Sequence, residues 1–228
     1  MAKFSNIIRE KNENILINKL IKTFKYYLKK NEKKTKRFSF VLTGGQSPIK
    51  LYKKIANDKK IVWRNVDFFI GDERYVSEKS KHSNINLCKK YLLNKIKVSK
   101  NQIYKIPTNK KSLKKDSISY NKILKKYFKG KKIVFSLVLL GIGNDGHIAS
   151  LFKNNIREKN SKNVSFVKKK DFNRITLTIS TINNSQLIFL WAPGKSKKKI
   201  IKRIQSDHTK EYPASFLRKK NNFLFYSN

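Results

Sequence analysis

An aspartate and a histidine two residues apart, Asp145 and His147, lie in a glycine-rich stretch that follows an apolar run. Residues 135–140 are FSLVLL, a pattern typical of a buried strand, and residues 141–147 are GIGNDGH. Histidine is the natural general base near neutral pH, and a nearby carboxylate can orient the imidazole or stabilise its charged form. An ordinary strand-to-helix turn would also contain glycines and a capping aspartate. This stretch alone leaves both interpretations open.

Glycines and a hydroxyl side chain lie between a predicted strand and a predicted helix in residues 43–48, TGGQSP. At a helix N-terminus, free backbone N–H groups and the positive end of the helix dipole favour a phosphate. The stretch matches neither a Walker A sequence nor GxGxxG, so a tight turn would also explain the glycines. The candidate ligand-binding residues here are Gly44, Gly45, Gln46 and Ser47.

Charged residues follow or begin three other predicted elements. In residues 71–76, GDERYV, an arginine could pair with an anion through its planar fork while the carboxylates orient hydroxyl groups. Arg174 begins a strand and Lys195 begins a helix, and either could bind phosphate. A surface ion cluster or a solvated cation would explain each feature when it is taken alone. The candidates in the first of these loops are Asp72, Glu73 and Arg74.

Strand and helix patterns alternate along the chain. Strands are predicted at 37–43, 66–70, 133–141, 174–180 and 186–194. Helices are predicted over 7–28, 49–57, 84–96 with Asn84 as N-cap, 117–128 and from 195 onwards, with a short helix after His147. This order predicts an α/β fold: an open, mostly parallel sheet covered by helices on both faces, Rossmann-like with three layers. We expect residues 1–228 to form a single domain.

The candidate loops share one position in this predicted fold. In open parallel sheets, ligands bind beyond the carboxyl ends of the strands. The loops that follow predicted strands are TGGQSP, GDERYV, GIGNDGH and APGK. Four loops therefore converge on one edge, which is the first argument that Asp145 and His147 belong to a site.

The net charge of +41 is the most conspicuous feature of the composition. Such a charge is expected of a nucleic-acid binder, yet only 8 of the 55 basic residues are arginine, and the lysines are spread along the whole chain. No nucleic-acid-binding motif accompanies them. Because Lys, Asn, Ile, Phe and Tyr all have A/T-rich codons, we attribute much of the lysine excess to genome base composition. We expect no specific nucleic-acid partner.

The remaining composition excludes several classes of protein. A single cysteine, Cys88, rules out an internal disulfide framework, and the three histidines lack metal-site spacing such as HExxH. No apolar stretch reaches the ~18 residues that span a bilayer. The N-terminus has the pattern of an amphipathic helix and not of a signal peptide. We therefore expect a soluble cytoplasmic protein without metal, cofactor or membrane partner. The sequence gives no oligomeric state, although a monomer is favoured.

Seven stretches together carry a resemblance to a known family. In chain order they are TGGQSPIKLYKKI, VDFFIGDERYV, Ser83-Asn84, LVLLGIGNDGHIASLF, RITLT, WAPGKSKKKII and YPAS. In this order and spacing the chain resembles the 6-phosphogluconolactonase family, within a larger group that also contains glucosamine-6-phosphate isomerases. The match covers about residues 38–217, and the GxGxDGHxASLF block is its most specific part.

The resemblance implies the metal-free hydrolysis of 6-phospho-D-glucono-1,5-lactone to 6-phospho-D-gluconate, the second step of the oxidative pentose phosphate pathway. It implies a carboxylic ester hydrolase in which His147 takes a proton from the attacking water and Asp145 supports the imidazole. The family positions near the sugar phosphate match Arg74, Arg174 and Lys195, and the Gly44-Gly45 turn would close around the ligand.

Two alternatives remain on the same fold: an isomerase or deaminase acting on an amino-sugar phosphate, and a non-catalytic polyanion-binding protein. The isomerases continue after GxGxDGH with Phe-Asn-Glu-Pro, whose carboxylate helps to open the sugar ring. Here the next carboxylate after His147 is Glu158, which favours a lactonase.

The chain departs from the family pattern at a few positions. Gln46 replaces a small hydroxyl residue, Ile148 replaces Thr, and Lys153 replaces the proline that often follows SLF. The chain ends at FLFYSN without the acidic helical segment common in relatives. These differences bear on substrate affinity and stability, and they leave the Asp145–His147 pair unchanged.

Overall fold

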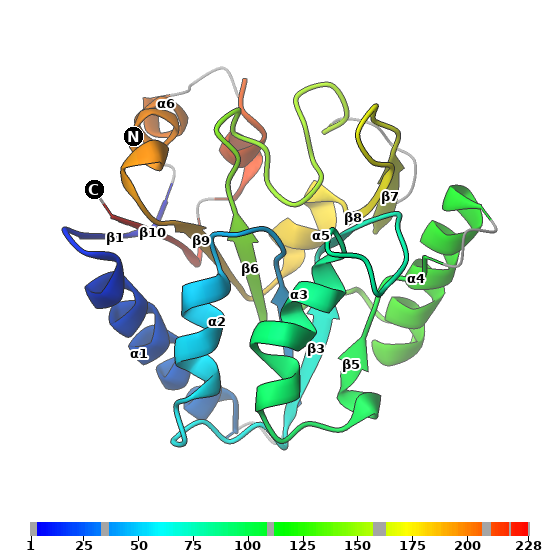
Figure 1. The fold of residues 1–228 in the computed structure, drawn as a ribbon, viewed down its shortest axis with the longest axis horizontal. Helices are drawn as coiled ribbons and strands as arrows, with labels where there is room; N and C mark the ends of the chain where they lie inside the picture. The colour runs from blue at the N-terminus through cyan, green and yellow to red at the C-terminus, as the bar shows by residue number, and fades with distance from the viewer. Residues whose placement is uncertain are drawn as a thin grey trace.

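The computed structural model describes residues 4–32, 37–108, 112–156, 163–206, 211–218 and 220–227. Its main element is an open seven-stranded sheet in which every strand pairing is parallel, with the order β1-β10-β9-β6-β2-β3-β5 (Figure 1). The strands are β1 (Asn6–Glu10), β2 (Phe38–Leu42), β3 (Val66–Ile70), β5 (Ile103–Tyr104), β6 (Leu137–Gly141), β9 (Leu187–Ala192) and β10 (Asn222–Ser227). The predicted α/β class with a parallel sheet is confirmed.

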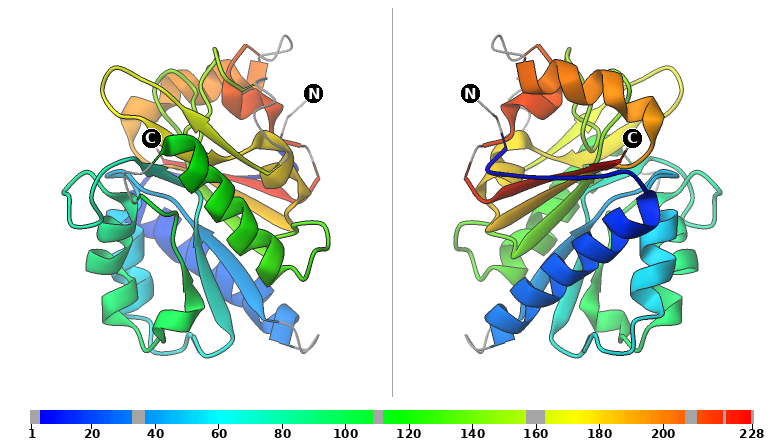
Figure 2. Two further views of the ribbon diagram at one scale, coloured as in Figure 1. Left: turned by 90° about the vertical axis from the view of Figure 1, so that its right-hand side faces the viewer. Right: turned by 90° about the vertical axis from the view of Figure 1, so that its left-hand side faces the viewer.

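Helices cover both faces of this sheet, as predicted. Figure 2 shows α2 and α3 on one face and α4 on the other. The α-helices are α1 (Glu13–Glu32), α2 (Ile49–Ala56), α3 (Asn84–Tyr91), α4 (Leu113–Tyr127), α5 (Ile179–Asn184) and α6 (Lys198–Ser206). Short 3₁₀ turns are η1 (Leu93–Lys95), η2 (Lys100–Gln102), η3 (Lys195–Lys197) and η4 (Pro213–Phe216).

The apolar runs found in the sequence form the centre of the sheet. Every residue of β2, β3 and β9 is buried, and so are the first four residues of β6. Strands covered on both faces have no solvent side, so they are apolar at most positions instead of alternating, with Ser39 and Asp67 as buried exceptions in β2 and β3. This explains why FSLVLL and QLIFLW could be recognised as strands.

A second, three-stranded antiparallel sheet lies beside the main one, in the order β4-β8-β7. Its strands are β4 (Asp72–Arg74), β7 (Val164–Val167) and β8 (Arg174–Leu177). The strand predicted at 174–180 belongs to this sheet and is shorter than predicted: it ends at Leu177, because Thr178 caps α5, which begins at Ile179. Only Gly71 separates β3 from β4, and β4 pairs with β8 so that Arg74 lies opposite Arg174.

Three further local predictions were wrong. The predicted N-terminal helix begins only at Glu13, because residues 6–10 form β1 against β10, a strand that the sequence did not indicate. The N-cap of α3 is Ser83 and not Asn84, since the Ser83 Oγ accepts the N–H of Asn86 at 3.2 Å. Residues 148–151 form a turn closed by a bridge between Ile148 and Leu151 instead of a short helix.

Two buried tyrosines tie helices to the ends of the strands that lead into the candidate loops. The Tyr52 hydroxyl of α2 donates to the Thr43 carbonyl at 2.7 Å and accepts the Thr43 N–H at 3.0 Å. The Tyr120 hydroxyl of α4 donates to the Ile70 carbonyl at 2.8 Å. These bonds fix the backbone at the first residue of the TGGQSP loop and directly before the GDERYV loop.

We expect Tyr52→Phe and Tyr120→Phe to lower the free energy of unfolding by about 1–3 kcal/mol each, because they leave buried backbone groups without a partner. Tyr52→Phe should cost more, since it removes two hydrogen bonds. Urea unfolding measures both effects, and Tyr26→Phe is the matched control because Tyr26 is 61% exposed. An unchanged urea midpoint for Tyr52→Phe would contradict this role.

Candidate active site

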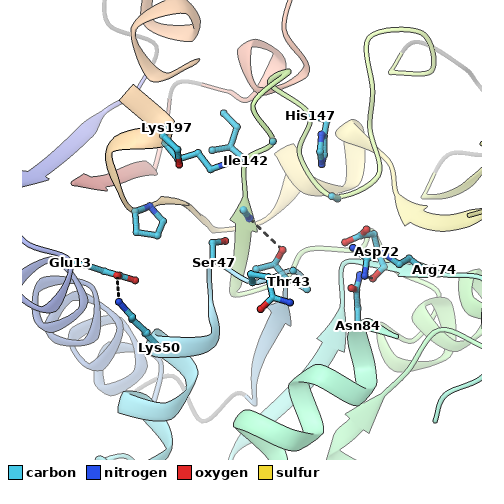
Figure 3. Close-up of a pocket in the computed structure, with 18 residues that line it drawn as sticks. Glu13, Thr43, Ser47, Lys50, Asp72, Arg74, Asn84, Ile142, His147 and Lys197 are labelled. Atoms are coloured by element: carbon cyan, nitrogen blue, oxygen red, sulfur yellow. Dashed lines mark hydrogen bonds and ion pairs between the residues drawn. The ribbon is translucent and has the colours of Figure 1, made fainter. Parts of the chain in front are cut away.

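A cavity of about 500 Å³ lies at the carboxyl edge of the parallel sheet (Figure 3). All four candidate loops contribute to its lining: residues 43–47 after β2, Asp72 and Arg74 after β3, Gly141–Gly143 with His147 after β6, and Pro193 after β9. The predicted convergence on one edge is therefore seen in the structure. It follows from the parallel pairing, which brings all these carboxyl ends together.

Asp145 and His147 interact directly. The Nδ1 atom of His147 lies 2.6 Å from Oδ1 of Asp145, and the same oxygen accepts the His147 backbone N–H at 3.2 Å. The His147 side chain lines the cavity and is 35% exposed. Partial burial acts to raise the pKa of Asp145, but the charge of His147 and its hydrogen bonds outweigh this and hold the pKa below its ordinary value.

Two glycines make the histidine loop possible. A Cβ atom at Gly143 would lie 2.1 Å from Nδ1 of His147, so only glycine leaves room for the imidazole. Gly146 has φ of +79°, and a Cβ atom there would lie 2.9 Å from the Tyr212 side chain. The loop is closed by a hydrogen bond from the Gly143 N–H to the His147 carbonyl, at 2.9 Å. The glycines flanking the pair are thus required by its geometry.

The TGGQSP loop presents backbone donors to the cavity. The N–H groups of residues 44–47 donate to no acceptor among the described residues, and α2 begins directly after them without a side-chain cap. Asn84 packs against Gly44 so closely that a Cβ atom at Gly44 would lie 2.0 Å from its Oδ1. The Trp191 indole N–H donates to the Ser47 carbonyl at 2.9 Å and ties the loop to β9. Free donors at a helix start suit an anion.

Asp72 and Arg74 lie together on another wall of the cavity (Figure 3). Asp72 accepts the Ser150 hydroxyl at 2.6 Å, and burial raises its pKa against the opposing effect of that hydrogen bond. Arg74 donates from Nη1 to the His82 carbonyl at 2.9 Å, which uses one end of its guanidinium. A carboxylate and a cation are therefore both available to a polar ligand.

Three expected ligand-binding residues do not line the cavity. Glu73 is 1% exposed, and its carboxylate accepts the N–H groups of Asn84 and Ile85 at the start of α3, at 2.6 and 2.8 Å. Arg174 is 9% exposed and is paired with Asp171. Lys195 begins the turn η3 and is exposed to solvent. The structure thus gives no support to ligand contacts by Glu73, Arg174 and Lys195.

Other residues line the cavity without having been singled out. Lys197 takes the place expected of Lys195, because the tight turn η3 directs the third residue of KSK and not the first toward the cavity. Its Nζ donates to Asn144 Oδ1 at 2.9 Å, and burial lowers its pKa. At the other side, Lys50 of α2 pairs with Glu13 of α1 at 2.8 Å. In a chain with 55 cations, the sequence offers no signal that selects these two lysines.

Among the described residues, no three or more His, Cys, Asp or Glu side chains are grouped so that they could hold a metal ion. Glu158 lies outside the described residues. None of the described helices combines the length and the apolar character needed to cross a membrane.

Comparison with known proteins gives consistent similarities. The family described as glucosamine-6-phosphate isomerases/6-phosphogluconolactonase matches residues 11–225. The chain is 30% identical to a 6-phosphogluconolactonase of Synechocystis over 82% of its own length and 80% of that protein. It is also 30% identical to a 6-phosphogluconolactonase of Thermotoga maritima, over 86% of each chain.

A solved structure shows the same fold. The 6-phosphogluconolactonase from Trypanosoma cruzi superposes with a TM-score of 0.86 at 26% sequence identity. The superposition covers the whole of this chain and 96% of that one. The similarity therefore includes the elements that build the cavity.

Glu73 makes the free energy of unfolding of the protein depend on pH. Burial raises its pKa from 4.5 to about 7, although the N–H groups of Ile85 and Asn84 oppose the shift. A carboxyl group with a higher pKa in the folded chain binds more protons when folded, so the free energy of unfolding falls as pH rises from about 4.5 through 7. We expect wild type to lose about 3 kcal/mol across this window relative to Glu73→Gln. Urea unfolding at pH 5 and pH 8 measures this change. If the free energy of unfolding changed by the same amount in both proteins, the prediction would be contradicted.

Proposed function

The chain belongs to the family of glucosamine-6-phosphate isomerases and 6-phosphogluconolactonases, and we propose that it works by general-base hydrolysis at His147. The reaction converts 6-phospho-D-glucono-1,5-lactone to 6-phospho-D-gluconate, in the pentose phosphate pathway, so the protein is a lactone hydrolase. The observation that carries the mechanism is the 2.6 Å contact between His147 and Asp145 on the wall of the cavity.

The hydrogen bond to Asp145 determines which nitrogen of His147 acts. An ionised carboxylate can only accept hydrogen bonds, so Nδ1 of His147 carries the proton that is shared with Asp145. The lone pair is then on Nε2. Nε2 removes a proton from water as the water oxygen bonds to C1 of the lactone, and the carbonyl electron pair moves onto its oxygen. The products of this step are an anionic tetrahedral intermediate and an imidazolium, which Asp145 stabilises.

The second step opens the ring. The electron pair returns from the oxyanion, and the bond between C1 and the ring oxygen breaks. The imidazolium gives its proton to that oxygen, which becomes the C5 hydroxyl group of the product. The new carboxylic acid loses its proton to solvent, and His147 is again a neutral base. No proton donor other than His147 is needed.

The remaining walls of the cavity match the charges of the substrate. The phosphate is an anion, and the described cations that line the cavity are Lys50, Arg74 and Lys197, together with the free N–H groups of residues 44–47. We assign these groups to the phosphate and to the oxyanion. We assign Asp72, which also lines the cavity, to accept hydrogen bonds from sugar hydroxyl groups. Charge-assisted hydrogen bonds of this kind are the strongest available to a protein without a metal.

His147→Ala should lower kcat by about 10²–10⁴-fold, the usual value of general-base assistance. Asp145→Asn should also lower kcat, since an amide can no longer fix the imidazole as a carboxylate does. The assay generates the lactone in situ and follows its hydrolysis against the spontaneous rate, with a chelator-treated sample beside it. We expect the chelator to have no effect and glucosamine 6-phosphate not to be converted. A folded wild type without turnover above the spontaneous rate would refute the lactonase function.

Lys195, two residues before Lys197 and outside the cavity lining, is a matched control for Lys197. We expect Lys197→Gln to lower kcat/KM for the phosphorylated lactone by about 10-fold or more, because it removes a charge-assisted contact worth about 1.5–3 kcal/mol. Lys195→Gln should stay within about 2-fold, since Lys195 does not line the cavity. A second substrate, glucono-1,5-lactone, has no phosphate and so separates a contact of Lys197 with the phosphate from a contact with the rest of the substrate. A loss confined to the phosphorylated substrate assigns Lys197 to the phosphate, and equal effects of the two variants would contradict the assignment of Lys197.

A further inference from the structure

Phe152 connects the catalytic loop to a cluster of cations. Its ring centroid lies 4.8 Å from that of the His147 imidazole, with 40° between the planes. The Lys169 Nζ lies 3.8 Å from the same ring centroid, and the Arg174 Cζ lies 5.6 Å from it. Phe152 is therefore the one residue that contacts both His147 and Arg174 through its ring in the described part of the chain.

Arg174 is held rigidly beside this ring. Its two terminal nitrogens donate to the two carboxylate oxygens of Asp171, at 2.9 and 2.6 Å, and Nη1 also donates to the Phe172 carbonyl at 2.6 Å. A bidentate pair fixes the plane of a guanidinium as well as its position. Arg174 does not line the active-site cavity, and its guanidinium, held in this way, lies beside the ring of Phe152.

The backbone brings Phe152 back toward His147. Ala149 has φ of +47°, a left-handed conformation that reverses the chain after the histidine, and the Leu151 N–H bonds to the Ile148 carbonyl at 2.9 Å. The Phe152 N–H then donates to Asn155 Oδ1 at 2.6 Å. The turn that replaces the predicted short helix therefore places the ring against the imidazole.

A second cavity explains why the size of this side chain matters. About 350 Å³ of space lies beside Phe152, and Asn155, Phe166 and Lys169 also line it. A shorter side chain at position 152 would extend that space toward His147. The hydrogen bond to Asp145 holds one atom of the imidazole, whereas Phe152 packs against the imidazole ring at a tilt of 40°. Both contacts restrict the direction of Nε2.

We propose that Phe152 is a positioning residue for His147, and that Arg174 acts by holding Phe152 and not by binding the substrate phosphate. The proposal rests on the proposed function of His147 as general base. Displacing a reacting atom by about 1 Å can cost 10²-fold in rate, so a support for the imidazole acts on kcat and leaves substrate binding unchanged. Arg174 is then functionally important without touching the substrate.

Phe152→Leu tests the first part, since it removes the ring and keeps an apolar side chain. We expect kcat to fall by about 10-fold with KM within 2-fold, and Phe152→Tyr, which restores the ring, to stay within about 3-fold of wild type. Arg174→Lys tests the second part, because lysine cannot form the bidentate pair with Asp171. It should lower kcat several-fold and leave KM for the phosphorylated lactone unchanged. A rise in KM confined to the phosphorylated lactone would overturn the role of Arg174.

A spectroscopic readout separates this proposal from the function on which it rests. The proton of His147 on Nδ1, shared with Asp145, is expected downfield in the ¹H NMR spectrum of the full chain, and His147→Ala identifies it by its loss. Phe152→Leu and Arg174→Lys should shift or broaden this signal, while Lys168→Gln, on the neighbour of Lys169, should not. If both variants leave the signal and kcat unchanged, the positioning role is wrong. If the enzyme has no lactonase activity, the signal alone still decides the proposal.

Discussion

One buried carboxylate, Glu73, determines how two walls of the active-site cavity fit together. Its oxygens accept the backbone N–H groups of Arg74, Asn84 and Ile85 and the Ser83 hydroxyl. These bonds hold β4 against the start of α3, where a carboxylate also complements the helix dipole. Asp72 and Arg74 on one side and Asn84 on the other take their places from this contact. A buried residue that does not line the cavity therefore helps to determine the shape of the cavity.

The histidine depends on a comparable set of constraints within a single loop. Gly143 leaves room for the imidazole, Gly146 adopts a left-handed backbone conformation, and Asp145 binds Nδ1. Each constraint is local and uses few atoms, which is why a loop of seven residues can hold the imidazole in one orientation. The parallel sheet supplies the rest by fixing the strand end from which the loop starts.

The fold and the contact between Asp145 and His147 could be predicted because their signals are local in sequence. Buried parallel strands are apolar at most positions, and the glycine-flanked Asp145–His147 pair is visible in seven residues. Side-chain direction could not be predicted in the same way. Lys195 and Lys197 differ only in their position within a 3₁₀ turn, and Glu73 differs from its neighbour Asp72 only in the alternation of a strand. Arg174 depends on a partner, Asp171, that a strand pattern does not reveal. Tertiary contacts determine which of these side chains faces the cavity.

The pairing of β1 with β10 has a consequence for the order in which the enzyme becomes complete. β10 is the only neighbour of β1 within the described sheet, and Ser5 bonds to Asn222 across 217 positions of the chain. β1 leads directly into α1, whose first turn carries Glu13 to the cavity and to Lys50. During synthesis β1 therefore cannot pair until β10 has been made. Contacts between residues so far apart in the sequence form slowly. The wall that contains Glu13 is therefore anchored only after the last strand has been made.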